Sequence, residues 1–289
     1  MKKSLVLLLI SSLVSGLYAR QPRTVVEPPF AFRNSGTLEI ERIELALEST
    51  TVYIQAYFRP HNWIRISSET YIRAGAEGEK LTVRSADGMP LDTEFYMPET
   101  GRHDFSLSFP PVDPKTAKID LIESDCPDCF KIYDIDLTGK KAKPGRSALA
   151  KKYKKTVPLT ENFTAPIVSD SPARIAGAIT GYDPRFFDRI EIAFYSPIVG
   201  DGATERKVPV HADGSFETEL NILTPICGTL FLPGFVTLPF YAEPGRETAL
   251  EIDLGAVYRK TSVFKELHPQ TSPVAYYGEL GRVNEELAR

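Results

Sequence analysis

Residues 50–58, TTVYIQAYF, decide the fold class of this chain, because every second residue from Val52 to Phe58 is apolar. A period of two places these side chains on one side of an extended strand, whereas a helix would need a period of 3.6. Residues 103–111, HDFSLSFPP, repeat the alternation. The sequence therefore predicts a mainly β protein.

The same pattern fills residues 25–139 with about six short strands, separated by turn signals such as ADGMP and ETG. No run of helical period interrupts them, so we predict an antiparallel β-sandwich of immunoglobulin-like size. Residues 140–173 are first basic and then rich in proline, serine and threonine, which is typical of a linker. Strands resume over residues 174–255 and predict a second, smaller antiparallel β-sandwich, with a tight hairpin turn at Asp213 and Gly214.

Residues 256–289 are predicted to form a connector and a C-terminal amphipathic helix. Ser272 is a suitable N-cap, Pro273 suits the first helical position, and Tyr277, Leu280 and Leu287 follow at helical spacing. The apolar face of such a helix needs a partner, either the preceding sandwich or something beyond this chain.

The N-terminus has the order of a secretory signal peptide. Lys2 and Lys3 precede an apolar run over residues 5–14, and Ala19 precedes Arg20, which predicts a signal peptide over residues 1–19. The apolar run is too short to span a membrane, and no second run is long enough. We therefore expect an exported protein of the periplasm or cell envelope. The formal net charge of −4 is not the basic balance typical of a nucleic-acid-binding protein.

Cys126 and Cys129, in IESDCPDCFKI, are the candidate site, either as a disulfide or as a redox pair. A redox Cys-x-x-Cys begins a helix whose N-terminus lowers the pKa of the attacking thiol. Here residues 130–137 alternate like a strand, and the flanking acidic residues would raise a thiol pKa. We favour a structural pair and keep a redox role as the alternative.

Other chemistry has weaker support in the sequence. Cys227 lies on an apolar segment and is expected to be a buried free thiol. No cysteine or histidine stands at zinc-ligand spacing, and no phosphate-binding loop is present, so no metal or cofactor is expected. A set of aromatic residues could form a carbohydrate platform, although packing in a sandwich core is the expected role. The set comprises Phe30, Phe32, Tyr53, Phe58, Trp63, Phe95 and Tyr96.

Several stretches resemble the N-terminal region of TlpA-like thioredoxin-family proteins exported by Bacteroidetes. The most specific are FRPHNWIRI at 58–66 and FYMPETG at 95–101, followed by IDLIESDCPDCFKIYDIDLTG at 119–139. ADGSFETEL, EPGRETALEIDL and YYGELGRVNEELAR look like the middle domain and connecting helix of the same proteins.

The resemblance implies an accessory part of a thiol–disulfide oxidoreductase. In that family the redox cysteines lie in a thioredoxin domain that follows the helix, so Cys126 and Cys129 do not match the catalytic position and no catalytic residue is carried over. We expect a non-catalytic module that docks an envelope protein or positions a thioredoxin domain. The alternatives are an oxidoreductase using Cys126 and Cys129, and a glycan-binding β-sandwich.

Overall fold

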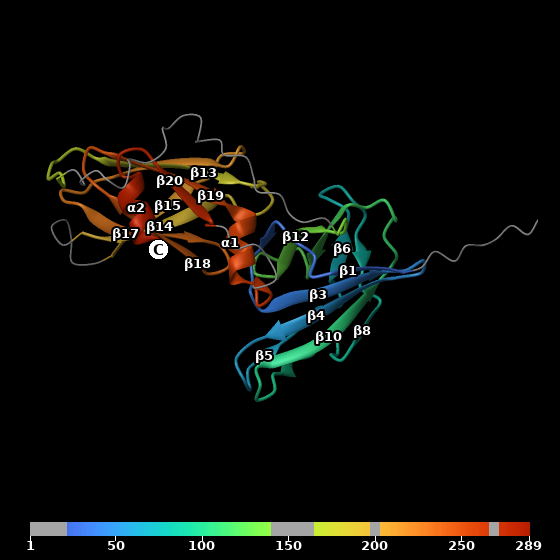
Figure 1. The fold of residues 1–289 in the computed structure, drawn as a ribbon. Helices are drawn as coiled ribbons and strands as arrows, with labels where there is room; N and C mark the ends of the chain where they lie inside the picture. Colours follow the sequence, from blue (N-terminus) through green and yellow to red (C-terminus); the bar gives the residue numbers. More distant parts are fainter. Residues whose placement is uncertain (1–21, 140–164, 197–202, 266–271) are drawn as a thin grey trace, which may run out of the picture.

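A computed structural model describes residues 22–139, 165–196, 203–265 and 272–289. Within these residues the protein is mainly β, with two sandwich-like domains, as the sequence predicted (Figure 1). It has two short helices, of which the one at Leu254–Thr261 was not predicted. The expected signal peptide at 1–19 and most of the expected linker lie outside the described residues. Residues 165–172, the described end of that linker, contain no helix or strand.

The first domain packs two five-stranded antiparallel sheets face to face. One sheet has the order β1 (Arg23–Val26), β3 (Leu38–Leu45), β4 (Thr50–Tyr57), β10 (Arg102–Phe109) and β8 (Ser85–Asp87). The other has the order β2 (Phe32–Arg33), β12 (Lys131–Asp136), β11 (Lys118–Ile122), β6 (Tyr71–Arg73) and β7 (Leu81–Thr82). A separate two-stranded ribbon joins β5 (Trp63–Ile64) to β9 (Phe95–Tyr96).

The alternation in residues 50–58 places its apolar side chains in the core of this domain. Val52, Ile54 and Ala56 are buried on β4, directly opposite the alternating residues of β10. Phe58 departs from the prediction, because β4 ends at Tyr57 and the Phe58 side chain is exposed. The period of two thus predicted the buried face of the strand but not its last residue.

The second domain also has two sheets, of four strands each. One has the order β16 (Ser215–Leu220), β13 (Ala173–Thr180), β19 (Glu247–Asp253) and β20 (Val274–Tyr277). The other has the order β15 (Ala203–Pro209), β14 (Arg189–Tyr195), β17 (Ile226–Leu232) and β18 (Val236–Ala242). Helix α1 (Leu254–Thr261) lies between the two domains and α2 (Gly281–Leu287) lies beside β18 and β20 (Figure 1).

Two details of the second domain differ from the sequence prediction. β13 and β19 pair in parallel, so this sandwich is not wholly antiparallel. The turn at Asp213 and Gly214 forms as expected, with Gly214 at a φ of 82°, where glycine avoids a Cβ clash. However, β15 and β16 on either side of it enter different sheets, so the turn is a corner and not a hairpin.

The C-terminal residues also differ from the predicted helix. Instead of starting a helix at Ser272, they pair as β20 with β19, and only Gly281–Leu287 are helical. Asn284 of α2 then closes the open edge of β18: its side chain accepts the Tyr241 N–H at 2.7 Å and donates to the Tyr241 carbonyl at 3.1 Å. Of the apolar residues expected on the helix face, Tyr277 and Leu280 are buried against their own sandwich, whereas Leu287 is 42% exposed.

Candidate functional site

Cys126 and Cys129 form a disulfide in the loop that joins β11 to β12. Both residues are half-buried. The chain continues from Cys129 directly into β12, so the expected strand is confirmed and no helix begins at the cysteine pair. The helix dipole that lowers a thiol pKa in thioredoxin-type sites therefore has no counterpart at this loop.

The disulfide loop is held from both sides by hydrogen bonds. The Asn34 side chain donates to the Cys129 carbonyl at 2.8 Å and accepts the Lys131 N–H at 2.7 Å. On the other side, Asp125 accepts the Tyr71 hydroxyl at 3.0 Å and the Lys80 ammonium at 2.7 Å. These contacts fix the loop beside β2 and β6, as expected for a disulfide with a structural role.

The charges beside the disulfide do not favour a thiolate. Hydrogen bonds from Lys80 and Tyr71 lower the pKa of Asp125, so this carboxylate stays ionised. Lys80 is therefore paired with Asp125 and not with a cysteine. Burial raises the pKa of Glu123, although the N–H of Phe130 acts in the opposite direction. Negative charge next to a cysteine raises the pKa of its thiol. The loop therefore suits a stable disulfide better than a reactive thiol.

A cluster of aromatic side chains joins the two domains. Phe32 of β2, which is 1% exposed, lies 5.2 Å from the ring of Phe186 and 5.2 Å from the ring of Tyr258, measured between ring centroids. Phe187 and Tyr133 complete the cluster at 5.6 and 6.1 Å from Phe32. The core of the second domain thus continues into the first without a polar boundary.

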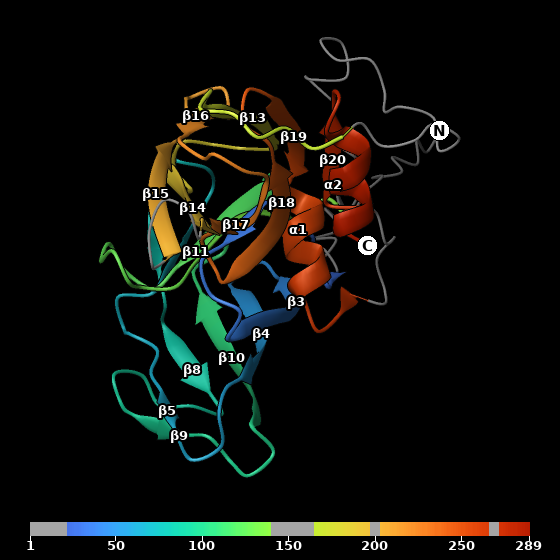
Figure 2. The ribbon, with the colours of Figure 1, turned by 90° about the vertical axis from the view of Figure 1, so that its left-hand side faces the viewer.

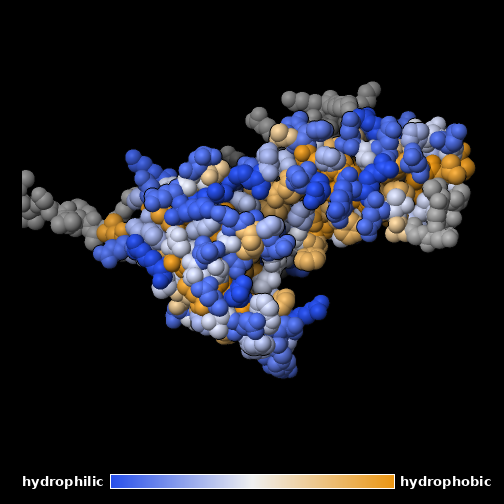
Figure 3. Space-filling model, turned by 180° about the vertical axis from the view of Figure 1, so that it is seen from behind, coloured by the Kyte–Doolittle hydropathy of each residue, from blue (hydrophilic) through white to orange (hydrophobic). Residues whose placement is uncertain are grey.

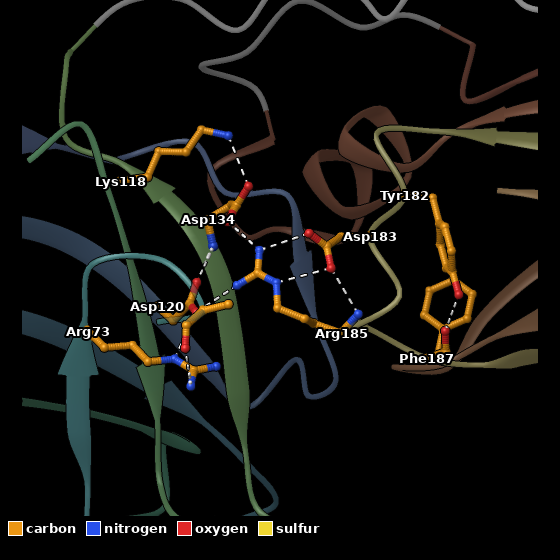
Figure 4. A network of polar contacts seen from close by, with 9 residues as sticks. Arg73, Lys118, Asp120, Asp134, Tyr182, Asp183, Arg185 and Phe187 are labelled. Carbon is orange, nitrogen blue, oxygen red and sulfur yellow. Dashed lines mark hydrogen bonds and ion pairs between the residues drawn. The ribbon is translucent and has the colours of Figure 1, made fainter. Parts of the chain in front are cut away.

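Arg185, in the loop between β13 and β14, extends this junction with ion pairs (Figure 4). Its guanidinium donates at 3.0 Å to Asp120 and at 3.0 Å to Asp134, both in the first domain, and also to neighbouring Asp183. Asp120 is 1% exposed and accepts a further bond from Arg73 at 3.2 Å. The Arg185 guanidinium lowers the pKa of Asp183. Because the Asp120 charge is buried, loss of Arg185 would be costly, since it would leave Arg73 as the remaining ion-pair partner of Asp120.

A buried ion pair within the first domain is bonded to the end of α1. Arg33 and Glu39 are both 2% exposed and lie 2.7 Å apart. Glu39 accepts the Ser262 hydroxyl at 3.0 Å and the Val263 N–H at 3.2 Å, at the C-terminal end of α1. Three sets of contacts therefore join the two sandwiches: the aromatic cluster, the ion pairs of Arg185 and the hydrogen bonds of Glu39 to the end of α1. We call them the domain junction.

The domain junction was not predicted from the sequence. Its residues come from segments far apart in the sequence, for example Glu39 and Ser262 at 223 positions, and nothing local marks them as partners. The loop sequence YDPRFF at 182–187 carried the available signal, because two adjacent phenylalanines in a polar turn would otherwise be exposed to water.

The expected core aromatics divide into two groups. Phe32 is buried, as predicted, and Phe30, Tyr53 and Phe95 are half-buried. Trp63 and Tyr96 correct the prediction, since they are 47% and 61% exposed and lie opposite one another on the β5–β9 ribbon. Cys227 is a second correction: β17 turns its side chain outward, so the free thiol is exposed and not buried.

Among the described residues, no group of three histidine, cysteine, aspartate or glutamate side chains is arranged to hold a metal ion. No helix in the described part of the chain is long and apolar enough to cross a membrane. Comparison of the chain with protein-family models, with curated proteins and with solved structures found no match.

Proposed function

We propose that this protein is an exported, non-catalytic module, like the accessory part of a TlpA-like thiol–disulfide oxidoreductase, that docks a partner or positions a redox domain. The observation that carries the proposal is the domain junction. A positioning module must hold a fixed geometry, and the aromatic cluster, the Arg185 ion pairs and the Glu39 hydrogen bonds to α1 favour one relative orientation of the two sandwiches. The N-terminal signal pattern and the Cys126–Cys129 disulfide support export.

The surface best suited to docking is a groove of about 350 Å³ between α1, β18 and β20. Its walls include Val257, Leu238 and Tyr276, and Phe235 at its rim is 98% exposed. Phe235 also has a φ of 64°, a strained conformation for a bulky residue. Strain combined with exposure of an aromatic ring is typical of a functional position.

The groove lies on the face that carries α1, opposite to the face drawn in Figure 3. Seen from behind, the molecule shows apolar patches broken up by charged side chains (Figure 3). Ala288 lines the groove, and in TlpA-like proteins the thioredoxin domain follows the helix at this point. We therefore propose a thioredoxin domain as the occupant, with Phe235 as its anchor.

The test is a titration of the purified chain with the thioredoxin domain of a TlpA-like oxidoreductase, followed by calorimetry. We expect saturable binding that Phe235→Ser weakens roughly tenfold, the size of effect that a single anchor residue gives. Phe231→Ser is the matched control, because Phe231 lies on the preceding strand and is 38% exposed. Absence of binding, or equal loss in both variants, would refute docking at this groove.

An oxidoreductase that uses Cys126 and Cys129 is the competing function. It predicts a reduction potential between about −120 and −270 mV, whereas a structural disulfide lies below about −300 mV. Thiol trapping in dithiothreitol and glutathione buffers measures this directly. Insulin reduction by the wild type that the double variant Cys126→Ser, Cys129→Ser abolishes would replace our proposal with this one.

A further inference from the structure

The β5–β9 ribbon has one buried side and one exposed side. Ile64 and Met97 point inward and are 8% and 2% exposed, whereas Trp63 and Tyr96 point outward. Because Trp63 and Tyr96 are directly opposed in an antiparallel pair, their side chains lie on the same face at adjacent positions. Figure 2 shows this ribbon at the end of the first domain that lies away from the second.

The two exposed rings rest on a rigid base. The ladder of the ribbon continues beyond β5 and β9, since the His61 N–H donates to the Met97 carbonyl at 3.1 Å and the Met97 N–H donates to the Asn62 carbonyl at 2.9 Å. The Tyr96 hydroxyl donates to Glu94 at 3.0 Å, which limits rotation of its ring. A ligand that stacks on this face would therefore lose little affinity to ordering of the protein.

Glu99 and Arg102, beside the ribbon, each have a polar partner. His61 lies 2.7 Å from Glu99, and Arg102 lies 2.9 Å from Asp104. The charged group bonded to one of the rings is Glu94, and its carboxylate disfavours an anionic ligand.

Hydrogen-bonding groups border the two rings. The Trp63 indole N–H has no partner among the described residues, and Glu94 accepts one hydrogen bond through one of its two carboxylate oxygens. A ligand for this face thus needs an apolar side for the rings and hydroxyl groups for the indole N–H and the carboxylate.

We propose that Trp63 and Tyr96 form a binding site for a neutral saccharide. A pyranose ring has a face of C–H groups, whose partial positive charge suits the negative face of an aromatic ring, and a rim of hydroxyls. The ring stacks across Trp63 and Tyr96, while its hydroxyls bond to the indole N–H and to Glu94. This site lies on the first domain and is independent of docking at the Phe235 groove.

Trp63 is the only tryptophan of the chain, so tryptophan fluorescence reports on this site alone. The purified protein is titrated with cello-, xylo-, manno- and chito-hexaose. We expect a saturable change for at least one, a roughly tenfold loss of affinity in Tyr96→Ala, and no loss in Tyr195→Ala, an exposed aromatic of the second domain. Calorimetry with Trp63→Ala replaces fluorescence, and circular dichroism checks that each variant is folded.

Three outcomes would overturn the site. One is no saturable response to any hexaose, and another is binding that survives both Trp63→Ala and Tyr96→Ala. The third is a Trp63 blue shift with neutral phosphatidylcholine vesicles but not with sugars, which would assign the face to a membrane surface. None of these changes the Phe235 titration, so failure of this site is distinguishable from failure of the docking function.

Discussion

Replacing Phe32 by alanine tests whether the two sandwiches behave as one body. Phe32 is 1% exposed and comes from the first domain, whereas three of the four rings around it, Phe186, Phe187 and Tyr258, come from the second. Truncation of a buried phenylalanine costs about 3–5 kcal/mol. Most of that loss falls on contacts across the domain junction, because only Tyr133 belongs to the same domain as Phe32.

The expected loss is large enough to measure in both stability and cooperativity. For a protein of this size, each kcal/mol lowers the melting temperature by about 2–4 °C, so Phe32→Ala should lower it by roughly 6–20 °C. Calorimetry gives the global transition, and Trp63 fluorescence gives the transition of the first domain alone. In the wild type we expect the two to coincide, and in Phe32→Ala we expect them to separate.

A second substitution distinguishes uncoupling from simple destabilisation. Phe216 is buried in the second domain, at 2% exposed, and has no place in the junction. Phe216→Ala should lower the Trp63 transition in the wild-type background, because the domains unfold together, but not in the Phe32→Ala background. If Phe216→Ala moves the Trp63 transition equally in both backgrounds, the aromatic cluster does not couple the domains and our reasoning fails.

Three further substitutions test individual features. Phe235→Gly should raise stability by up to about 1 kcal/mol, since it relieves a left-handed strain of about 1–2 kcal/mol at a slightly smaller entropic cost; a lower urea midpoint would show that the ring packs. Asn284→Ala should cost about 1–3 kcal/mol and speed hydrogen exchange of the Tyr241 amide, which it would leave unpaired; unchanged exchange would contradict this role. Burial raises the pKa of Glu123, so its ionisation destabilises the fold as pH rises through the folded-state pKa. Glu123→Gln should therefore be stabilising in urea unfolding at pH 7.5 and neutral at pH 4, and an equal effect at both would refute the assignment.

The candidate site was predictable where its chemistry depended on local sequence. The alternation after Cys129 predicted a strand and so argued against thiol activation, and β12 confirms that strand. The residues around the disulfide were not predictable from the sequence. Asn34 lies 95 positions from Cys129, and Tyr71 lies 54 positions from Asp125.

The C-terminal segment shows how tertiary contacts override local signals. Ser272 and Pro273 are good residues for a helix start, yet the Pro273 carbonyl accepts the Asp253 N–H at 2.9 Å and the segment pairs with β19. Propensity contributes a few tenths of a kcal/mol per residue, so the edge of an existing sheet can outweigh it.

The sequence by itself determined that the chain is built from strands, because the period of two is a property of consecutive residues. It did not determine which side of each strand is covered. Trp63 and Cys227 both lie on strands, and both are exposed because no element among the described residues packs over that face. Likewise, the Asp120 charge is buried beside two cations, Arg73 of its own domain and Arg185 from across the domain junction. Burial is set by partners distant in sequence, and only the tertiary structure brings them together.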